Sequence, residues 1–305
     1  MFSSRTAWNL TTNRFTQAIE QRRKAGAKLL DLTVSNPTSC GLKYDQAAIL
    51  AALQNPKSLI YEPAPRGLLE ARAAVADYYS PANVSPDDVI LTTSTSEAYS
   101  FLFRLLCDPG DEVLIPRPSY PLFDFLATLD DVRLAPYSLV YDHGWQVDFH
   151  SLESAITSKT KAIIVVNPNN PTGSYLKPQE LAQLNEVCTK RALAIIADEV
   201  FLDYSLAREA VGQSLAGNND GLTYVLSGLS KICGLPQMKV AWIVTSGSPD
   251  KKREALARLE IITDTYLSMN APLQMATPAL LQLRGDCQKQ LKARTARNLA
   301  GLHGR

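Results

Sequence analysis

The chain has 305 residues, 46% of them hydrophobic, which is enough to bury one large core or two ordinary ones. Lysine and arginine number 31 against 30 aspartate and glutamate residues, for a formal net charge of +1. This balance argues against nucleic acid or an anionic membrane as a bulk electrostatic partner. Five scattered cysteines without a CxxC pair predict reduced thiols and no zinc or other metal site.

The start of the chain carries no targeting signal of the secretory kind. Residues 1–10 include Arg5 and Asn9 and lack an apolar stretch, and no run of about 18 apolar residues occurs anywhere. We therefore expect a cytoplasmic protein that does not span a membrane.

The amino-terminal region predicts an arm with little core of its own. Residues 13–28 have the pattern of a polar amphipathic helix, and residues 29–34 that of a short strand. Two helices are expected next, at 45–53 and 68–79, separated by a proline-stiffened loop that holds Tyr61 in place.

From residue 88 onward, apolar runs alternate with helical patterns. Strands are expected at 89–92, 112–115, 132–139, 162–166, 192–197 and 222–226. Helices are expected at 97–107, 120–129, 177–190, 251–262, 271–283 and 286–302. This alternation predicts an α/β fold, a three-layer sandwich around a mostly parallel sheet. In such sheets the carboxyl ends of the strands form the ligand crevice.

Lys231 follows the apolar run 222–226, where a buried strand is expected to end. Desolvation at such a place disfavours the charged form of a lysine, and a neutral lysine is the nucleophile that Schiff-base chemistry needs. The alternative is a lysine whose side chain extends from the strand end into water.

The segment 92–98, Thr-Thr-Ser-Thr-Ser-Glu-Ala, closes a strand and opens a helix. Free backbone N–H groups and the helix dipole make an anion site there, and the hydroxyls of Thr95 and Ser96 add donors. A phosphate would fit this site. Ordinary N-capping by Ser94 or Ser96 is the alternative.

Two more expected strand ends carry polar residues. Residues 167–173, Asn-Pro-Asn-Asn-Pro-Thr-Gly, form a constrained loop that places Asn amides such as Asn170 at the sheet edge, where one can donate to a ligand oxygen. Asp198 ends the next apolar strand, and a carboxylate in that position needs a cationic or hydrogen-bonding partner. The alternatives are a simple turn for the loop, and a helix N-cap or structural ion pair for Asp198.

Asn170, Asp198 and Lys231 at three successive strand ends, with Thr95 and Ser96 at a helix start, resemble the fold-type-I pyridoxal-phosphate-dependent aminotransferases of class I/II. The Asn-Pro-x-Asn-Pro-Thr-Gly signature is among the more specific ones of that family. The resemblance runs over essentially the whole chain. It implies an enzyme that moves an amino group between an amino acid and a 2-oxo acid.

The resemblance also implies roles for the matching residues. Lys231 would form the Schiff base with pyridoxal 5'-phosphate and later act as the base, and Asp198 would pair with the pyridinium nitrogen so that the ring is an electron sink. Asn170 would donate to the phenolate oxygen of the cofactor. Tyr120 matches the aromatic residue that stacks on the pyridine ring.

The remaining matches concern the cofactor phosphate. By resemblance, Thr95, Ser96 and Lys239 would hold it. Tyr61 matches the residue that reaches the phosphate of the neighbouring subunit's site, which implies a homodimer.

Two residues near these positions depart from the family pattern. Lys239 stands where the family usually has arginine, so a bidentate fork becomes a point charge and phosphate binding should weaken somewhat. Phe201 stands where many members have a tyrosine, so a donor to the phenolate oxygen is missing and the pKa of the Schiff base should rise. Tyr204 is a candidate substitute for that donor.

The carboxyl-terminal part differs more. The resemblance implies an arm with part of a small domain at 1–40, a large cofactor-binding domain at 41–284, and the start of a small domain at 285–305. The family completes this domain with strands that carry the arginine for the substrate carboxylate, and the sequence ends before them, so we expect the small domain to be incomplete. We interpret four late arginines as solvated helix charges: Arg284, Arg294, Arg297 and Arg305.

Three other functions remain open. A carbon–sulfur lyase on the same scaffold would use the same cofactor residues. A chain without the substrate-carboxylate arginine could be an inactive cofactor-binding fragment. A cofactor-binding regulator would carry a DNA-binding domain ahead of this fold, and the short polar start before Leu29 leaves no room for one.

Overall fold

The structure is a computed structural model that describes residues 1–206, 212–267 and 269–303. The chain divides into two compact units, Met1–Leu42 and Lys43–Arg305. The expected division at residue 284 stays a prediction.

The first unit contains η1 (Ser4–Thr6) and α1 (Arg14–Lys24), which confirms the amphipathic helix expected there. The helix begins where the Asn13 side chain accepts a hydrogen bond of 2.8 Å from the Thr16 N–H. The strand expected at 29–34 is wrong, because this segment has no regular secondary structure. A strand is stabilised by pairing, and Leu30 and Leu32 are exposed instead of covered by a sheet.

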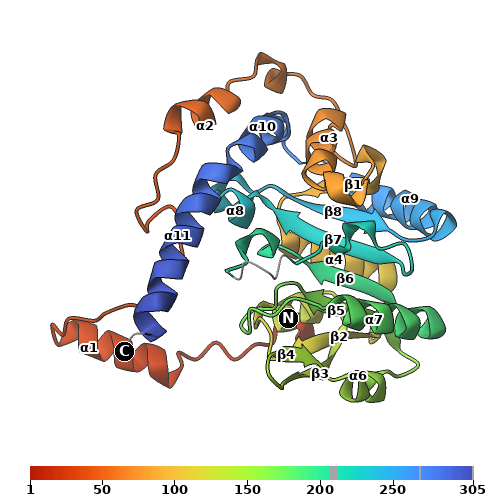
Figure 1. Ribbon diagram of the computed structural model, residues 1–305, viewed down its shortest axis with the longest axis horizontal. Helices are drawn as coiled ribbons and strands as arrows, with labels where there is room; N and C mark the ends of the chain where they lie inside the picture. The colour runs from red at the N-terminus through yellow and green to blue at the C-terminus, as the bar shows by residue number, and fades with distance from the viewer. Residues whose placement is uncertain (207–211, 268, 304–305) are drawn as a thin grey trace. The chain divides into compact units, whose positions relative to one another are not determined.

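The second unit is built on an eight-stranded sheet in the order β1-β8-β7-β6-β5-β2-β3-β4, and Figure 1 shows β1 at the top of the sheet and β3 and β4 at its lower end. The strands are β1 (Val89–Thr92), β2 (Glu112–Arg117), β3 (Arg133–Tyr141), β4 (Trp145–Val147), β5 (Thr160–Val166), β6 (Ala194–Asp198), β7 (Thr223–Gly228) and β8 (Ala241–Ser246). Strands β3, β2, β5, β6 and β7 pair in parallel, whereas β8 is antiparallel to both of its neighbours and β4 to β3. The expected mostly parallel sheet is confirmed.

Except for two short helices at Phe149–Ala155 and Leu229–Ile232, which were not expected, the helices of this unit agree with the expected ones to within three residues at each end. They are α2 (Gln46–Ala52), α3 (Leu69–Tyr78), α4 (Thr95–Leu106), α5 (Leu122–Leu129), α6 (Phe149–Ala155), α7 (Pro178–Arg191), α8 (Leu229–Ile232), α9 (Pro249–Thr265), α10 (Ala271–Gln282) and α11 (Arg284–His303). Short 3-10 helices are η2 (Pro56–Leu59), η3 (Ser80–Ala82), η4 (Pro86–Asp88), η5 (Leu202–Tyr204), η6 (Leu215–Gly217) and η7 (Pro236–Met238). Within the described ranges, no helix has the length and apolarity to cross a membrane.

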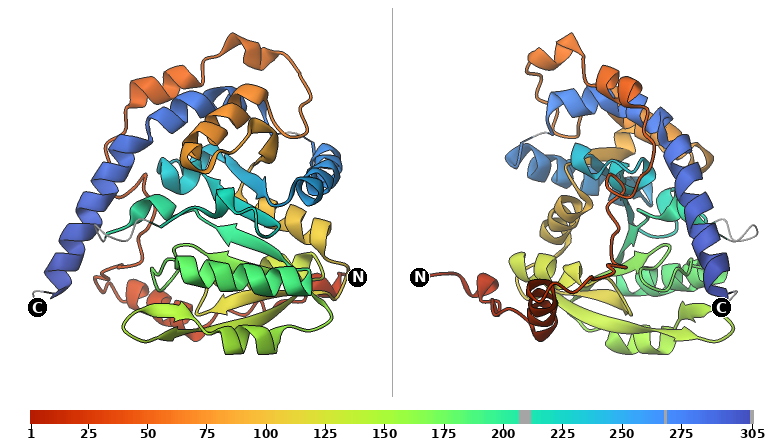
Figure 2. Two further views of the ribbon diagram at one scale, coloured as in Figure 1. Left: turned by 45° about the vertical axis from the view of Figure 1, so that its right-hand side comes forward. Right: turned by 90° about the vertical axis from the view of Figure 1, so that its left-hand side faces the viewer.

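Helices cover both faces of the sheet, as expected for a three-layer fold. Along β5, Ile163 and Val165 pack into one apolar cluster, while Ala162 and Ile164 pack into the other. The first cluster includes residues of α3, α7 and α10, and the second includes residues of α4, α5 and α9. Figure 2 shows α7 crossing one face of the sheet. The period of two along each strand thus divides the core into two layers.

The direction of the strands decides which segments meet at one edge. Strands β5, β6 and β7 are neighbours and run parallel, so their carboxyl ends lie side by side. Because β8 is antiparallel to both β1 and β7, the carboxyl end of β1 lies at the same edge. The start of α4 is therefore brought to the edge where β5, β6 and β7 end.

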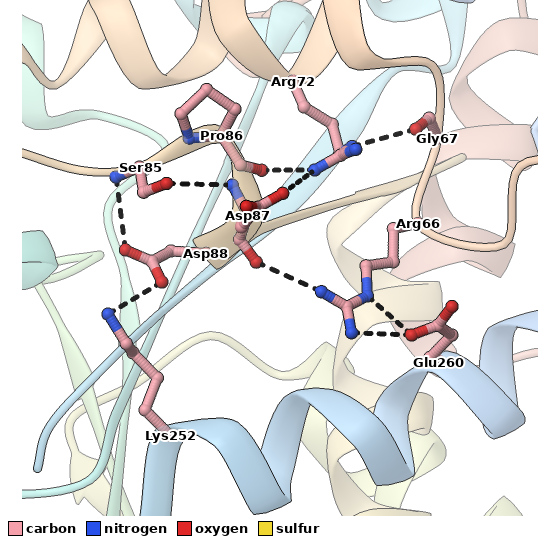
Figure 3. A network of polar contacts seen from close by, with 9 residues as sticks. All are labelled: Arg66, Gly67, Arg72, Ser85, Pro86, Asp87, Asp88, Lys252 and Glu260. Atoms are coloured by element: carbon pink, nitrogen blue, oxygen red, sulfur yellow. Dashed lines mark hydrogen bonds and ion pairs between the residues drawn. The ribbon is translucent and has the colours of Figure 1, made fainter. Parts of the chain in front are cut away.

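A polar network fixes the loop that enters α3 (Figure 3). Nε and Nη2 of Arg66 donate to the same carboxylate oxygen of Glu260 over 2.9 and 2.6 Å, and Nη1 donates to the Asp87 carbonyl over 3.4 Å. The ammonium of Lys252 pairs with Asp88 at 2.8 Å. These contacts join the loop after Tyr61 to η4 and α9.

Replacing Gly67 with alanine should destabilise the fold. Gly67 has φ +95°, and an added Cβ would lie 2.6 Å from Cδ1 of Leu91. Strained backbone and overpacking together predict a loss of about 2–4 kcal/mol. The matched control is Gly285→Ala, where no atom lies within 4 Å of the added Cβ and stability should be kept or rise by about 0.5 kcal/mol. Urea unfolding measures both, and equal midpoints for the two variants would contradict the prediction.

Candidate active site

Backbone pairing puts three strand ends in register. Asp198 lies opposite Val166 of β5 on one side and Leu226 of β7 on the other. The ladder continues past the strands, because the Asn167 N–H donates to the Asp198 carbonyl and the Glu199 N–H donates to the Leu226 carbonyl, each over 2.8 Å. The loop after β5, the end of β6 and the helical turn after β7 are thereby held next to one another.

The carboxylate of Asp198 is held by two hydrogen bonds at the end of a buried strand. The Tyr99 hydroxyl donates to Oδ2 over 3.1 Å, and the Val200 N–H donates to Oδ1 over 3.2 Å. Burial raises the pKa of Asp198 to about 6, although these two donors and the Lys231 ammonium act to lower it. Asp198 is therefore an acid whose charged form calls for a further cationic partner.

Lys231 lies on the short helix α8, directly beyond the glycine that ends β7. A Cβ on Gly228 would lie 2.6 Å from the Val240 carbonyl, so glycine permits the close approach of β8. The Lys231 ammonium lies 5.5 Å from the centre of the Phe201 ring, a cation–π distance. The expectation that Lys231 is shielded from water is wrong for the single chain, because the residue is exposed. The side chain of Lys231 is open to water, whereas the backbone that leads into its turn is packed against β8.

Tyr204 does not offer a free hydroxyl at this site. Its hydroxyl donates to the Lys231 carbonyl over 2.6 Å, and burial raises the pKa of Tyr204 above its usual range. The structure thus gives Tyr204 the task of fixing the turn that carries Lys231. Its suggested role as a substitute donor next to Phe201 is not supported by this geometry.

The loop 167–173 is pinned by its own amides. The side-chain N–H₂ of Asn169 donates to the Thr172 hydroxyl over 2.9 Å and to the Pro118 carbonyl over 3.3 Å. Asn170 is only partly buried, and it borders a cavity of about 490 Å³ together with Phe201. The constrained loop expected from the sequence is therefore confirmed, and it presents Asn170 toward open space.

The start of α4 leaves backbone donors free. Ser94 caps the helix by accepting from the Glu97 N–H over 3.1 Å, and Glu97 accepts from the Thr93 N–H over 2.7 Å. The N–H groups of Thr95 and Ser96 lie in the first turn, where a helix offers no acceptor of its own. Capping by Ser94 is confirmed, and the anion site expected in the first turn stays a prediction.

Tyr120 is linked to the site by a row of aromatic rings. Its ring is 48% exposed and meets Phe123 edge-on with 6.4 Å between centres. Phe123 in turn meets Tyr99 edge-on at 5.2 Å, and Tyr99 donates to Asp198. These ring contacts connect Tyr120 to the side chain that donates to Asp198.

Lys239 and Tyr61 are placed differently from each other. Lys239 is exposed, has φ 52° and lies two residues before Ala241, the first residue of β8, which pairs with Gly228. It is thus near the end of β7. Tyr61 is 81% exposed and borders a separate cavity of about 120 Å³ with Asn270. Within one chain the structure does not bring Tyr61 to the other candidate residues.

Two residues at the site were missed by the sequence reasoning. Tyr99 lies one helical turn after Thr95, a spacing that places both on one face of α4 and that could have indicated it. Glu199 follows Asp198 and is buried, with Ser214 donating from its hydroxyl over 2.6 Å and Leu215 from its N–H over 2.7 Å. Burial raises the pKa of Glu199 to about 7. The sequence could have indicated Glu199, because it is a second acidic residue at the end of an apolar run.

The late arginines differ from one another. Arg284 is wrong as a purely solvated charge, because its guanidinium lies 5.7 Å from the centre of the Tyr78 ring and donates to the Leu281 carbonyl. Arg297 is exposed as expected, whereas Arg294 is partly buried. Arg305 lies outside the described residues. A larger cavity, about 540 Å³ and bordered by Trp145 and Lys177, contains none of the expected site residues.

The sequence matches one protein family over residues 7–301, and that family is described as aminotransferase class I and II. The glutamate-pyruvate aminotransferase AlaA of Haemophilus influenzae is 30% identical over 260 residues, which cover 84% of this chain and 64% of that protein. An alanine aminotransferase of Mycobacterium tuberculosis is 32% identical over 262 residues, covering 84% and 61%. The chain thus spans less than two thirds of these curated relatives.

Solved structures show the same fold. The structure of alanine aminotransferase from Pyrococcus furiosus superposes with a TM-score of 0.82 at 25% sequence identity. The match covers 96% of this chain and 76% of that one. The α/β architecture with its mixed, mostly parallel sheet is the architecture of that enzyme.

Replacing Asp198 with asparagine should stabilise the cofactor-free protein at neutral pH. The pKa of Asp198 is raised from 3.8 to about 6 by burial, so the folded state holds this proton more tightly than the unfolded state does. The contribution of Asp198 to the free energy of unfolding is therefore fully present at low pH, and it is lost as the pH rises from about 4 through about 6. Asp198→Asn should be more stable than the parent by about 2–3 kcal/mol near pH 8, with a smaller difference near pH 4.5.

Denaturant unfolding of both proteins across this pH range measures the difference. The control is Asp88→Asn, which removes the pairing of Asp88 with Lys252 and should lower stability. A stability difference between Asp198→Asn and the parent that does not change with pH would rule out the explanation by burial.

Proposed function

Because the chain belongs to the class I and II aminotransferase family, we propose that it is an aminotransferase that moves an amino group between an amino acid and a 2-oxo acid. The cofactor of this family is pyridoxal 5'-phosphate. One observation carries the proposal: Asn170, Asp198 and Lys231 lie at the carboxyl ends of three adjoining strands, at the edge where α4 begins.

The residues at this edge fit the charges of that cofactor. The Asp198 carboxylate, whose pKa is raised by burial, would gain from a cationic N–H such as that of a protonated pyridine ring. The free N–H groups of Thr95 and Ser96 suit a phosphate at the start of α4, with the Lys239 charge as a further contact. Each part of the cofactor thus has a chemically matched group on this chain.

When bound, pyridoxal 5'-phosphate supplies an electron sink for the carbanion that remains after an α-proton is removed. Asp198 would keep the ring nitrogen protonated, since an anion next to it favours the charged form. Asn170 would donate its amide N–H to the phenolate oxygen, and Tyr120 would cover one face of the ring. These three residues would bind and orient the reacting group.

Lys231 has two tasks in this proposal. Its amine would anchor the cofactor covalently, and once a substrate amine had replaced it, the free amine would move the proton from the substrate α-carbon to the cofactor carbon. The exposed position of Lys231 leaves its side chain room to move, while the hydrogen bond from Tyr204 holds its backbone. The ammonium lies 5.5 Å from the centre of the Phe201 ring and lowers the pKa of Asp198.

The relatives suggest which substrates to try first. One is named a glutamate-pyruvate aminotransferase and another an alanine aminotransferase, so alanine and glutamate are our proposed amino donors. We also propose a cytoplasmic homodimer in which the exposed Tyr61 reaches the phosphate of the neighbouring site. In it, residues 41–284 form the cofactor domain, and residues 1–40 and 285–305 belong to a smaller domain.

Reduction with borohydride should fix a yellow cofactor on Lys231. Peptide mapping of the reduced protein should find the label on the Lys231 peptide, and Lys231→Ala should lose both the label and at least about a hundredfold in amino transfer. The control Lys251→Ala changes an exposed lysine on α9 and should keep both.

The same preparation distinguishes the reaction class. Amino transfer from alanine to a 2-oxo acid supports the proposal. Release of pyruvate and ammonia from a substrate with a β-leaving group, without amino transfer, would instead identify an eliminating enzyme. A label on any other lysine would contradict the assignment of the site.

A further inference from the structure

Tyr99 is a buried residue whose hydroxyl contacts Asp198, and the proposed function assigns it no part in the reaction. It lies on α4 and is 2% exposed, and its hydroxyl lies 3.1 Å from Oδ2 of Asp198. Its ring is held on two sides, at 5.2 Å from Phe123 and 6.0 Å from Phe103, measured between ring centres. The position of the hydroxyl is therefore set by the packing of α4.

The Tyr99 hydroxyl can only donate to Asp198. Burial, followed by the adjacent Asp198 charge, raises the pKa of Tyr99 well above its usual range, so the phenol keeps its proton. A donor favours the ionised form of the carboxylate that accepts from it. Because the Val200 N–H holds the other oxygen, both oxygens of Asp198 are fixed and the plane of the carboxylate is set.

The other groups that face Asp198 act in different directions. From α8, the Lys231 ammonium lowers the pKa of Asp198, but it is the smallest of the named influences. Glu199 is the next residue on the chain. The negative charge of Asp198 repels that of Glu199 and raises the pKa of Glu199. Tyr99 is thus the side chain that donates a hydrogen bond to this carboxylate.

We propose that Tyr99 is a positioning residue for the amino-transfer reaction: its hydroxyl keeps the Asp198 carboxylate ionised and oriented toward the cofactor ring nitrogen. This inference rests on the proposed function, because it needs a cofactor whose ring meets Asp198. Tyr99 itself does not touch the reacting atoms. It acts through Asp198.

The test is Tyr99→Phe in the full chain. Phenylalanine keeps the ring contacts with Phe123 and Phe103 and removes only the donor. Without it the pKa of Asp198 should rise by about one unit or more, because a hydrogen bond to the charged form is lost. The dissociation constant of pyridoxal 5'-phosphate should then be roughly three- to tenfold weaker than the parent's at about pH 6.5 and nearly equal at about pH 8.5.

Tyr224→Phe is the matched control. Tyr224 is fully buried on β7, and among the buried side chains that the structure describes its hydroxyl has no hydrogen-bond partner. The same atom is removed in both variants, so the control should bind the cofactor like the parent at both pH values. Thermal unfolding of the cofactor-free proteins should place all three within a few degrees of one another.

The outcomes separate the inference from the proposed function. A pH-dependent loss of cofactor affinity in Tyr99→Phe, absent from Tyr224→Phe, supports the inference. Equal affinity of Tyr99→Phe and the parent at both pH values overturns it, and so does an equal loss at both, which would mean a structural role. A parent protein that binds no pyridoxal 5'-phosphate at Lys231 overturns the proposed function and this inference with it.

Discussion

The central constraint on this structure is the need to keep the Asp198 carboxylate charged at the end of an apolar strand. Residues 195–197 of β6 are fully buried, and Asp198 continues that strand between β5 and β7. Burial alone disfavours the charged carboxylate. Three groups favour it: the Tyr99 hydroxyl on α4, the Val200 N–H, and the Lys231 ammonium on α8. The order of the strands in the sheet is what allows these groups to converge.

Stability and function are assigned to different parts of the second unit. The two apolar layers and the polar network around Arg66 hold the scaffold together without Asn170, Asp198 or Lys231, although the Tyr99 ring packs in the second layer. At the sheet edge the opposite holds, because the partly buried Asp198 and the buried Glu199 are acids whose pKa values are raised by burial. This division is the one expected where a site must keep groups available for a ligand.

Much of the fold and the site could be predicted because the signals are local. Each buried strand of the parallel sheet is a continuous apolar run, and the loop 167–173 is limited by its prolines and glycine. The sequence-based predictions of secondary structure were wrong or incomplete where the local residue pattern does not determine the structure. Residues 29–34 have a strand-like pattern but no pairing partner, and the three-residue strand β4 and the short helix α6 are too brief to show a period.

The sequence by itself determined which chemical groups follow each strand: amides after β5, a carboxylate after β6 and a lysine after β7. Only the tertiary structure decided that Tyr99 donates to Asp198, that Tyr204 fixes the backbone of Lys231, and that Lys231 is open to water. The physical reason is that a strand end is coded by neighbouring residues, whereas a hydrogen bond between α4 and β6 spans 99 positions of the chain. Such a contact exists only after the sheet has placed its strands in order.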